Sequence, residues 1–313
     1  MSDTSDTPRV LVMMATYNGS RFVAEQIQSI MSQADVEVFL RVCDDRSTDH
    51  TYRLLKDIAA IHPNVTVSQN QTNLGVGKNF MQMVYEETAR DYDYYAFSDQ
   101  DDIWLPNKLS EAIEFVKGHD EPTLYYSDVL NFSDEGEFME LRDYHEVLDH
   151  PATLLLRSWA CGCTMVFNRA LRDLLCEHPL DEFPRIHDTW VHLVALNCGS
   201  VEADIERSFI RRRLSGANVV GELSDHHTSV SDVLKSVKSL LGASTRRPSK
   251  VARQLYNEFG DNINPVLAPE LSMLLSYRSS VARRLKAAAR FDFWQPTLRG
   301  RALVRLCFLL GRY

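Results

Sequence analysis

Short apolar segments alternate with amphipathic segments through the first hundred residues of the chain. Val10–Ala15 and Val36–Cys43 are brief apolar runs, which is typical of buried strands. Between them, apolar positions recur at helical spacing from Phe22 to Ile30. The whole pattern predicts strands at 10–15, 36–43, 65–67 and 94–97 and helices at 22–30, 49–61 and 79–89. Such alternation predicts an α/β fold with a mostly parallel sheet between two layers of helices.

The alternation weakens beyond residue 120. Strand-like segments are expected at 125–128 and 164–167, a turn at 134–136, a short helix at 188–196 and an edge segment at 208–212. Residues 222–250 are rich in Ser and Lys, which is typical of a linker, and the remainder is helical and basic. We therefore expect a helical C-terminal extension after the α/β part.

Polar side chains follow three of the predicted strands, at the point where each strand ends. They are Thr16, Tyr17 and Asn18 in the first group, Asp44 and Asp45 in the second, and Asp99, Asp101 and Asp102 in the third. Ligands of parallel sheets bind beyond the carboxyl ends of the strands, which meet at one edge. These distant groups should therefore share one rim, and their convergence is the first indication of a functional site.

The acidic loop at 99–102 suits a divalent cation. Carboxylate oxygens bind Mg²⁺ or Mn²⁺, and such an ion can neutralise the charge that develops on a departing nucleotide diphosphate. An isolated Asp-x-Asp is usually a solvated turn. Here a buried strand precedes the loop and the apolar segment Ile103–Pro106 follows it, and these flanks favour a metal site.

Two further segments carry candidate contacts to a nucleotide. An aspartate at 44 or 45 could accept a hydrogen bond from a pyrimidine N–H or a ribose hydroxyl, while Ser47, Thr48 or Asp49 would cap the next helix. In the segment 73–79, glycines permit close approach of the backbone, and Lys78 could meet phosphate or ribose. A plain loop is the alternative for this second segment.

Three ordered motifs, Ala15–Gly19, Val42–Asp49 and Phe97–Trp104, resemble those of the family-two inverting glycosyltransferases of GT-A fold. The form Ser-Asp-Gln-Asp-Asp-Ile-Trp, together with Gly162–Met165 and His187–Trp190, is similar to the rhamnosyltransferase-like branch that makes O-antigen, capsule and exopolysaccharide. The resemblance covers roughly residues 9–221. It implies a nucleotide-sugar donor and a divalent metal, Mg²⁺ or Mn²⁺.

The resemblance also implies roles for the residues of the donor side. Asp44 or Asp45 would hold the base, Asp99 the ribose and diphosphate, and Asp101 and Asp102 the metal. The complete set of expected donor contacts is Thr16, Tyr17, Asn18, Asp44, Asp45, Asn73, Gly75, Lys78, Asp99 and Arg213.

On the acceptor side, an inverting transfer needs a base that deprotonates the attacking hydroxyl. The resemblance gives this role to Asp188, and capping of a helix is the alternative. We place Trp104, Trp190 and His187 on the acceptor side, where Trp190 would form an apolar wall or stack on a sugar. His187 is expected to be a neighbour of the base rather than the base itself, and a metal ligand is the less favoured role.

One stretch departs from the family pattern. Relatives often carry Tyr-Arg-x-His before a Gly and an Asn, whereas Ile210–Gly221 keeps Asn218 and Gly221 but lacks the Tyr and the His. Guanidinium groups suit phosphate oxygens. We therefore expect Arg213, with Arg212 as the second choice, to contact the diphosphate.

The net charge of −9 is unevenly distributed. Residues 278–313 hold nine Arg and Lys against one acid and so carry +8, which leaves −17 on the rest. An acidic body with one basic end makes nucleic acid an unfavourable partner. Leu and Arg alternate through 297–312, which resembles a basic amphipathic helix on an anionic membrane surface. A packing helix or an oligomer interface explains the same pattern.

The remaining features concern the compartment. The chain starts without a charged and apolar leader, and no apolar run approaches the about 20 residues that span a bilayer. The six cysteines form no disulfide ladder, so we expect reduced thiols and a cytoplasmic protein, with attachment to the inner face of the cell membrane as an option. Cys161 and Cys163 lack a second Cys or His pair, so a zinc site is set aside.

These inferences predict a glycosyltransferase domain at 8–221, with a nucleotide-sugar half to about 120 and an acceptor half at 121–221, and then a linker and basic helices at 222–313. The expected reaction moves L-rhamnose from dTDP-L-rhamnose to a glycan or lipid-linked acceptor. A glucosyl- or galactosyltransferase using a UDP-sugar and a non-catalytic scaffold of a glycan assembly complex are alternatives. A nucleotidyltransferase is disfavoured because no Gly-rich triphosphate loop follows the first strand.

Overall fold

The structure is a computed structural model that describes residues 7–86, 91–132, 145–156, 158–180, 187–214, 247–290, 293 and 298–313. The chain divides into two units. Unit 1 consists of residues 1–143 and 160–214, and unit 2 consists of residues 144–159 and 215–313. The two units are described separately.

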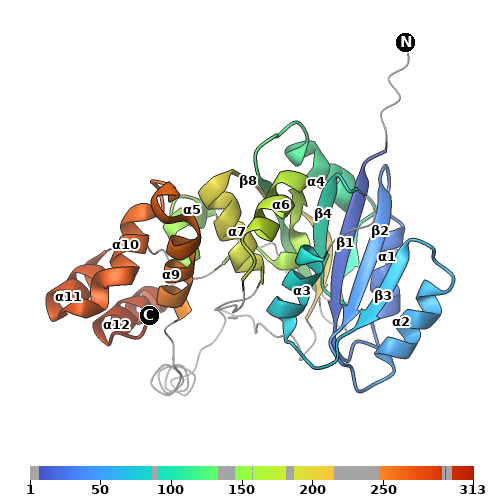
Figure 1. The fold of residues 1–313 in the computed structure, drawn as a ribbon, viewed down its shortest axis with the longest axis horizontal. Coiled ribbons are helices and arrows are strands. Elements are labelled where there is room, and N and C mark those ends of the chain that lie inside the picture. The colour runs from blue at the N-terminus through green and yellow to red at the C-terminus, as the bar shows by residue number, and fades with distance from the viewer. Residues whose placement is uncertain are drawn as a thin grey trace, which may run out of the picture. The chain divides into compact units, whose positions relative to one another are not determined.

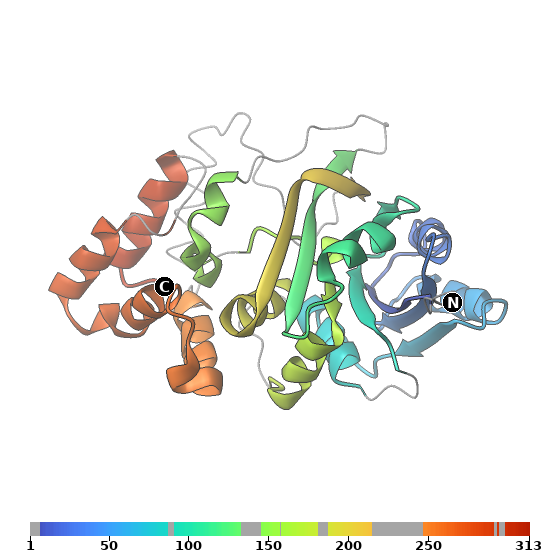
Figure 2. The same ribbon diagram turned by 90° about the horizontal axis from the view of Figure 1, so that it is seen from above.

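Unit 1 is built on a sheet whose strands lie in the order β3-β2-β1-β4-β7-β6-β8-β5 (Figures 1 and 2). The strands are β1 (Arg9–Thr16), β2 (Glu37–Asp44), β3 (Val65–Gln69), β4 (Tyr94–Ser98), β5 (Ile103–Trp104), β6 (Thr123–Phe132), β7 (Val166–Asn168) and β8 (Ser200–Arg213). The first four strands of the order are parallel, and β6 and β8 are parallel to each other. β7 runs antiparallel to β4 and β6, and β5 runs antiparallel to β8. The predicted α/β fold with a mostly parallel sheet is confirmed.

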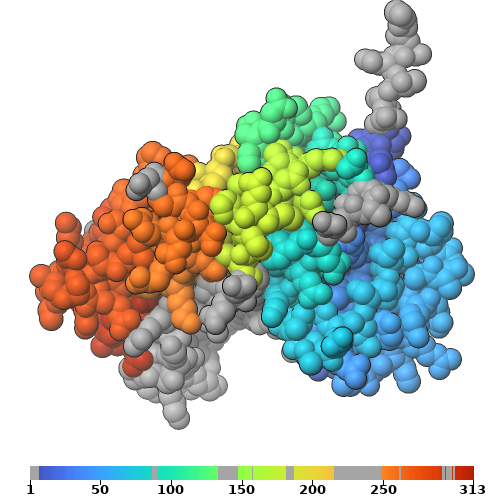
Figure 3. Space-filling model, viewed as in Figure 1, coloured from blue at the N-terminus to red at the C-terminus, as the bar shows by residue number. Residues whose placement is uncertain are grey.

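Helices cover both faces of this sheet because its central strands are apolar on both sides. The helices of unit 1 are α1 (Val23–Met31), α2 (Thr51–Ala59), α3 (Val76–Tyr85), α4 (Lys108–Val116), α6 (Arg169–Glu177) and α7 (His187–Cys198). Alternate residues of β1, such as Val10 and Val12, pack in one core with α1, α2 and α4. On the opposite face, α3, α6 and α7 pack side by side (Figures 1 and 3). Phe80 of α3 contacts Phe97 of β4 there, with ring centroids 5.3 Å apart.

The topology determines which loops meet at the carboxyl rim of the sheet. Thr16 pairs with Asp44, and Met14 pairs with Ser98, so β1, β2 and β4 end at the same level. Because β7 is antiparallel to β4, the segment before β7 lies at this rim as well. That segment is the short 3-10 helix η2 (Gly162–Thr164).

Unit 2 is helical throughout its described part. It contains α5 (His145–Leu148), η1 (Pro151–Leu155), α9 (Arg247–Phe259), η3 (Gly260–Asn262), α10 (Ala268–Ser276), η4 (Tyr277–Ser279), α11 (Val281–Ala289) and α12 (Leu298–Leu309). Leu255, Leu271 and Leu274 are buried, and the rings of Tyr277 and Phe308 pack edge to face at 5.3 Å. The predicted helical extension is confirmed. No helix of the described chain is both long enough and apolar enough to cross a membrane.

Two local predictions are wrong, and three others fall wholly or mostly outside the residues that the structure describes. The predicted edge segment at 208–212 is part of β8, which pairs with β6 on one side and β5 on the other, so the edge assignment is wrong. Ser47 and Thr48 do not cap α2, because Ser47 bonds Asp44 and the side chain of Asp49 accepts from Thr51 N at 2.9 Å. The turn at 134–136, the domain boundary at 221 and most of the linker at 222–250 lie outside the described residues.

Candidate active site

Asp44, the last residue of β2, accepts four hydrogen bonds at the rim. Its Oδ1 accepts from Thr16 Oγ1 at 3.1 Å and from Ser47 Oγ. Its Oδ2 accepts from Ser47 N at 2.9 Å and from Gln69 Nε2 at 2.8 Å. A carboxylate offers about four acceptor sites, so protein donors use those of Asp44. The buried side chain therefore holds the ends of β1, β2 and β3 together.

Asp45 shapes the loop that leads into α3. Its carboxylate accepts from Leu74 N and Gly75 N, each at 2.8 Å. Gly75 has a φ of 80°, a conformation in which a side chain would be strained. Asn73 donates its Nδ2 to the Asp45 carbonyl oxygen at 3.0 Å, and Lys78 is exposed in the first turn of α3. Asn73, Gly75 and Lys78, three of the expected donor contacts, therefore lie on the segment that Asp45 organises.

The loop after β1 is bonded to the loops after β2 and β4. Tyr17 N donates to Gln100 Oε1 at 2.9 Å, and Gln100 Nε2 donates to the Tyr17 carbonyl oxygen at 3.1 Å. Asn18 Oδ1 accepts from Thr48 N at 2.8 Å. The three polar groups that follow the predicted strands are thus joined on one rim. No local pattern singles out Gln100, although it lies within the acidic motif.

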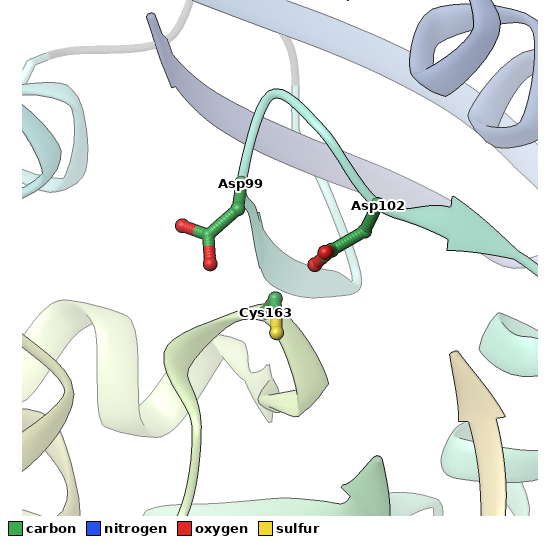
Figure 4. Close-up of side chains that lie close together, drawn as sticks. All are labelled: Asp99, Asp102 and Cys163. Atoms are coloured by element: carbon green, nitrogen blue, oxygen red, sulfur yellow. The ribbon is translucent and has the colours of Figure 1, made fainter. Parts of the chain in front are cut away.

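Asp99, Asp102 and Cys163 form a compact group that we call the acid–thiol cluster. A carboxylate oxygen of each aspartate and Cys163 Sγ all lie within 4.8 Å of one another (Figure 4). The aspartates come from the loop between β4 and β5, and Cys163 comes from η2. Burial, aided by the charge of Asp101, raises the pKa of Asp99 to about 6. Burial and the charge of Asp99 raise the pKa of Asp102 well above its ordinary value.

Two basic side chains, the buried Lys108 and the half-buried Arg212, act on the acid–thiol cluster. Lys108 Nζ lies 3.8 Å from the ring centroid of Trp104 and has no hydrogen-bond partner among the described residues. Burial lowers the pKa of Lys108 to about 7. The pKa of Arg212 is raised, because the thiols and carboxylates of the cluster and of Cys161 outweigh the opposite effect of burial.

Arg213, the first choice for the diphosphate contact, is held by groups of unit 1. Its Nη2 donates to Glu25 Oε2 at 2.8 Å. Its guanidinium lies 4.5 Å from the ring centroid of Phe22 and 4.6 Å from that of Phe132. Successive side chains of a strand point to opposite faces. Arg212, the second choice, is accordingly the arginine whose charge acts on the acid–thiol cluster.

Asp188 lies in the first turn of α7, next to η2. A Cβ at Gly162 would lie 3.5 Å from Asp188 Cβ, so the backbone of η2 approaches Asp188 closely. Burial, with a smaller contribution from the charge of Cys161, raises the pKa of Asp188 to about 7. One carboxylate oxygen accepts from Thr189 N, which satisfies an N–H group at the start of the helix. Asp188 makes this bond from within the helix, so its roles as helix cap and as base both stay predictions.

The three aromatic residues placed on the acceptor side are buried. Trp104 and Trp190 are each 3% exposed and His187 is 5% exposed. The His187 ring stacks on Phe80 at 4.0 Å, and both its nitrogens lack hydrogen-bond partners in the described chain. Burial lowers the pKa of His187 to about 3, so the imidazole is neutral at pH 7. These rings can form apolar walls, and none of them is an open platform.

The comparisons with known proteins agree with this geometry. The sequence profile described as "Glycosyl transferase family 2" matches residues 11–175, which is more than half of the chain. The chain belongs to glycosyl transferase family 2. The match runs from β1 into α6 and so includes Asp44, Asp45 and the acid–thiol cluster. Asp188, Arg212 and Arg213 lie beyond it.

Among curated relatives, dTDP-rhamnosyl transferase RfbG of Shigella flexneri is 36% identical over 126 residues, which cover 39% of this chain and 43% of RfbG. The chain thus matches less than half of the length of that family member.

Two solved glycosyltransferase structures share the GT-A fold. TarS 1–349 of S. aureus in complex with UDP-GlcNAc has a TM-score of 0.53 at 18% identity, covering 97% of this chain and 93% of that chain. The mannosyltransferase PcManGT from Pyrobaculum calidifontis, in complex with GDP-Man and Mn²⁺, has a TM-score of 0.53 at 17% identity, covering 99% and 82%. At these identities the likeness is one of fold.

Proposed function

We propose that this family 2 enzyme is an inverting, metal-dependent glycosyltransferase that moves L-rhamnose from dTDP-L-rhamnose to a glycan or lipid-linked acceptor of a cell-surface polysaccharide. The observation that carries the proposal is the position of Asp188 against η2, whose Cys163 belongs to the acid–thiol cluster. A base and a cation site for the leaving group are then adjacent. Similarity to RfbG, a dTDP-rhamnosyl transferase, supports the donor.

The donor end of the site would recognise the base, ribose and diphosphate. Asp45 is a better candidate for the base contact than Asp44, because Asp44 accepts four protein hydrogen bonds, whereas Asp45 accepts three, from Asn70, Leu74 and Gly75, and so keeps about one acceptor site. Asn73, Gly75 and Lys78 lie on the adjoining segment, and Thr16, Tyr17 and Asn18 end β1 beside it. Arg212 would meet the phosphates, while Arg213 would hold the loop of Asp101 and Asp102 through its bond to the Asp101 carbonyl oxygen at 3.2 Å.

The residues of the acidic loop fit a divalent cation, Mg²⁺ or Mn²⁺. Oδ2 of Asp102 is buried and has no hydrogen-bond partner among the described residues, and a buried carboxylate oxygen of this kind suits a positive ligand. Asp101 and Asp102 remain the proposed ligands, and the geometry adds Asp99. When bound, the cation would neutralise charge that develops on the nucleotide diphosphate. The Mn²⁺ in PcManGT supports this assignment.

Asp188 would act on the acceptor. As the acceptor oxygen attacks the anomeric carbon, its proton passes to the Asp188 carboxylate and the bond to the diphosphate breaks on the opposite side. The neutral His187 and the buried Trp190 and Trp104 would shape an apolar wall around the base. A low-polarity surrounding keeps the pKa of the base close to neutral pH, where proton transfer is efficient.

The decisive experiment measures nucleotide release with Mn²⁺ or Mg²⁺, a panel of acceptors and four donors: dTDP-L-rhamnose, UDP-glucose, UDP-galactose and UDP-GlcNAc. We expect turnover with dTDP-L-rhamnose. Preference for a UDP-sugar would favour the alternative of a glucosyl- or galactosyltransferase. The UDP-GlcNAc complex of TarS supports a UDP-sugar donor. Metal-dependent nucleotide binding without turnover on any acceptor would favour the scaffold alternative, and binding of no donor would refute the proposal.

Asp188→Asn tests the base directly. We expect the transfer rate to fall by about 10²- to 10⁴-fold, while donor affinity measured by calorimetry stays within about threefold because the amide keeps the shape of the carboxylate. Asp204→Asn is the matched control, since Asp204 is also buried but bonds Arg207 and Tyr125 in β8 and β6. Transfer that survives in Asp188→Asn would remove Asp188 from the role of base.

A further inference from the structure

The acid–thiol cluster combines hard and soft ligand atoms. Two carboxylates and one thiol converge from two separate chain segments, and Asp102 and Cys163 are 2% and 1% exposed. Figure 4 shows Asp99 and Asp102 on the two limbs of their loop, with the carboxylate of Asp102 directed towards Cys163. The sequence alone gave no reason to join Cys163 to these aspartates.

A second observation points to a ligand at this place. Asp102 Oδ1 accepts from Arg213 N at 3.3 Å, but Oδ2 is buried without a hydrogen-bond partner in the described residues. An unsatisfied buried carboxylate oxygen is costly. The single hydrogen of the Cys163 thiol can serve only one carboxylate at a time, and a thiol is a weak donor. A bound cation would satisfy both aspartates at once.

We propose that Cys163 Sγ is a further protein ligand of the cation that holds the nucleotide diphosphate, so that the site prefers a transition metal over Mg²⁺. The inference rests on the proposed function, in which Asp101 and Asp102, together with Asp99, hold that cation. Thiolate is a soft ligand that suits Zn²⁺ and related transition ions, whereas Mg²⁺ takes oxygen ligands. Binding replaces the S–H bond of Cys163 by a metal–sulfur bond and releases the thiol proton to solvent.

Distances and charges both allow this arrangement. Metal–sulfur and metal–oxygen bonds of about 2.3 and 2.1 Å place two ligands of one ion at most about 4.4 Å apart. The observed limit of 4.8 Å therefore requires only a small rotation, which the partly exposed Asp99 can supply. With both aspartates and the thiolate ionised the cluster carries three negative charges, of which a divalent ion would balance two, while Arg212 and Lys108 supply positive charge near the third.

Binding of Co²⁺ reports a metal–sulfur bond through its absorption spectrum, without any measurement of sugar transfer. The 313-residue chain, stripped with a chelator and kept reduced by a phosphine, is titrated with Co²⁺ while the near-ultraviolet charge-transfer absorption of a cobalt–thiolate bond is recorded. We expect a band that saturates at one Co²⁺ per chain, is lost in Cys163→Ser and persists in Cys176→Ser and Cys198→Ser. In calorimetry, Cys163→Ser should lower Zn²⁺ affinity by at least about tenfold and Mg²⁺ affinity by less than about threefold.

Absence of the band from the unmodified protein would overturn the inference, and so would its persistence in Cys163→Ser or its loss in Cys198→Ser. If Cys163→Ser fails to fold, Asp102→Asn provides the second test. This variant should weaken Co²⁺ binding by at least about tenfold, and unchanged affinity would place the thiolate elsewhere and overturn the inference.

The failure of this inference differs from the failure of the proposed function. Nucleotide binding that depends on Mn²⁺, in a protein that gives no cobalt–thiolate band, would refute only the role of Cys163. A cobalt–thiolate band in a protein that binds neither dTDP nor UDP would support Cys163 as a metal ligand and refute the proposed nucleotide-sugar donors.

Discussion

At the scale of single residues, burial shifts the pKa values of two neighbouring side chains in opposite directions. Burial raises the pKa of Asp188 to about 7 and lowers the pKa of His187 to about 3. In both cases the uncharged form gains, because desolvation penalises charge of either sign. At neutral pH the site therefore presents a neutral imidazole beside a carboxyl group that is about half ionised, which is the condition for an efficient general base.

The rate of transfer should consequently depend on pH through Asp188. The base works only when ionised, so we expect kcat/KM for the acceptor to rise about tenfold per pH unit well below pH 7 and to level off above it. Nucleotide release measured from about pH 5.5 to about pH 8.5 tests this. A profile without an inflection between about pH 6 and about pH 8 would contradict the assignment.

The raised pKa of Asp188 also makes the free energy of unfolding depend on pH in a definite direction. The folded-state pKa of Asp188 lies above the unfolded value, so between the two values the folded chain binds more protons than the unfolded chain. Its contribution to the free energy of unfolding is therefore present at low pH. That contribution falls as the pH rises from about 4 to about 7 and is constant above this range. Asp188→Asn should remove this part of the pH dependence in thermal melts.

Residue identity alone predicts part of the site. Asp44 and Asp45 were equivalent candidates in the sequence, and only their partners distinguish them: Asp44 joins three strand ends, whereas Asp45 organises the loop before α3. No local pattern connects Lys108 or Cys163 with the acidic loop. Cys163 reaches that loop only because β7 pairs antiparallel with β4, which is a tertiary effect. Strand alternation alone could have shown that Arg212 and Arg213 face opposite sides.

At the scale of elements, the sequence predicts the first half of unit 1 well. The predicted strands and helices up to residue 97 correspond to β1–β4 and α1–α3, because their apolar runs and periodicity are strong. β5 is only two residues long, and β8 pairs with β6 through register shifts at Ser127 and Asp128 that disturb the polar alternation. Irregular pairing of this kind is a tertiary effect that a local pattern does not contain.

The approach of η2 to α7 gives a prediction at this scale. In Gly162→Ala the new Cβ would lie 2.6 Å from His187 Nε2. The imidazole cannot withdraw easily, because it packs on Phe80 at 4.0 Å and against Phe97 at 4.7 Å. The start of α7 should shift with Asp188, and we expect a loss of transfer of about 100-fold with a loss of about 1–3 kcal/mol in the free energy of unfolding.

Rates and denaturant melts of this variant provide the measurement. The matched control introduces Gly162→Ala in a His187→Ala background, where the added methyl group enters space that the imidazole has vacated. The added substitution should then cost less than it does alone. An equal cost in both backgrounds would show that the contact with His187 is irrelevant.

At the scale of the whole molecule, the charge separation in the sequence corresponds to a structural division. The segment 278–313, with its charge of +8, lies entirely within unit 2. In α12, Cys307 and Phe308 are buried in unit 2, whereas Leu298, Leu306 and Leu309 are exposed, and Leu310 just after the helix is exposed too. An apolar surface among basic residues is compatible with the membrane contact through 297–312, which stays a prediction.

A vesicle experiment decides between membrane contact and simple packing for this surface. If the segment binds anionic lipid, the protein should co-sediment with phosphatidylglycerol vesicles, and less so at high salt, because screening weakens the attraction. Replacing Leu306, Leu309 and Leu310 together by Ser should lower the partition coefficient at least about tenfold, since each leucine loses apolar area that the bilayer would bury. Ile61→Ser, at a site 75% exposed in unit 1, is the control and should have no effect. Because all three leucines are exposed, the triple variant should melt within a few degrees of the unmodified chain, so a lost partition would reflect the surface and not unfolding. Equal sedimentation of the two chains would exclude a lipid-binding role for these leucines.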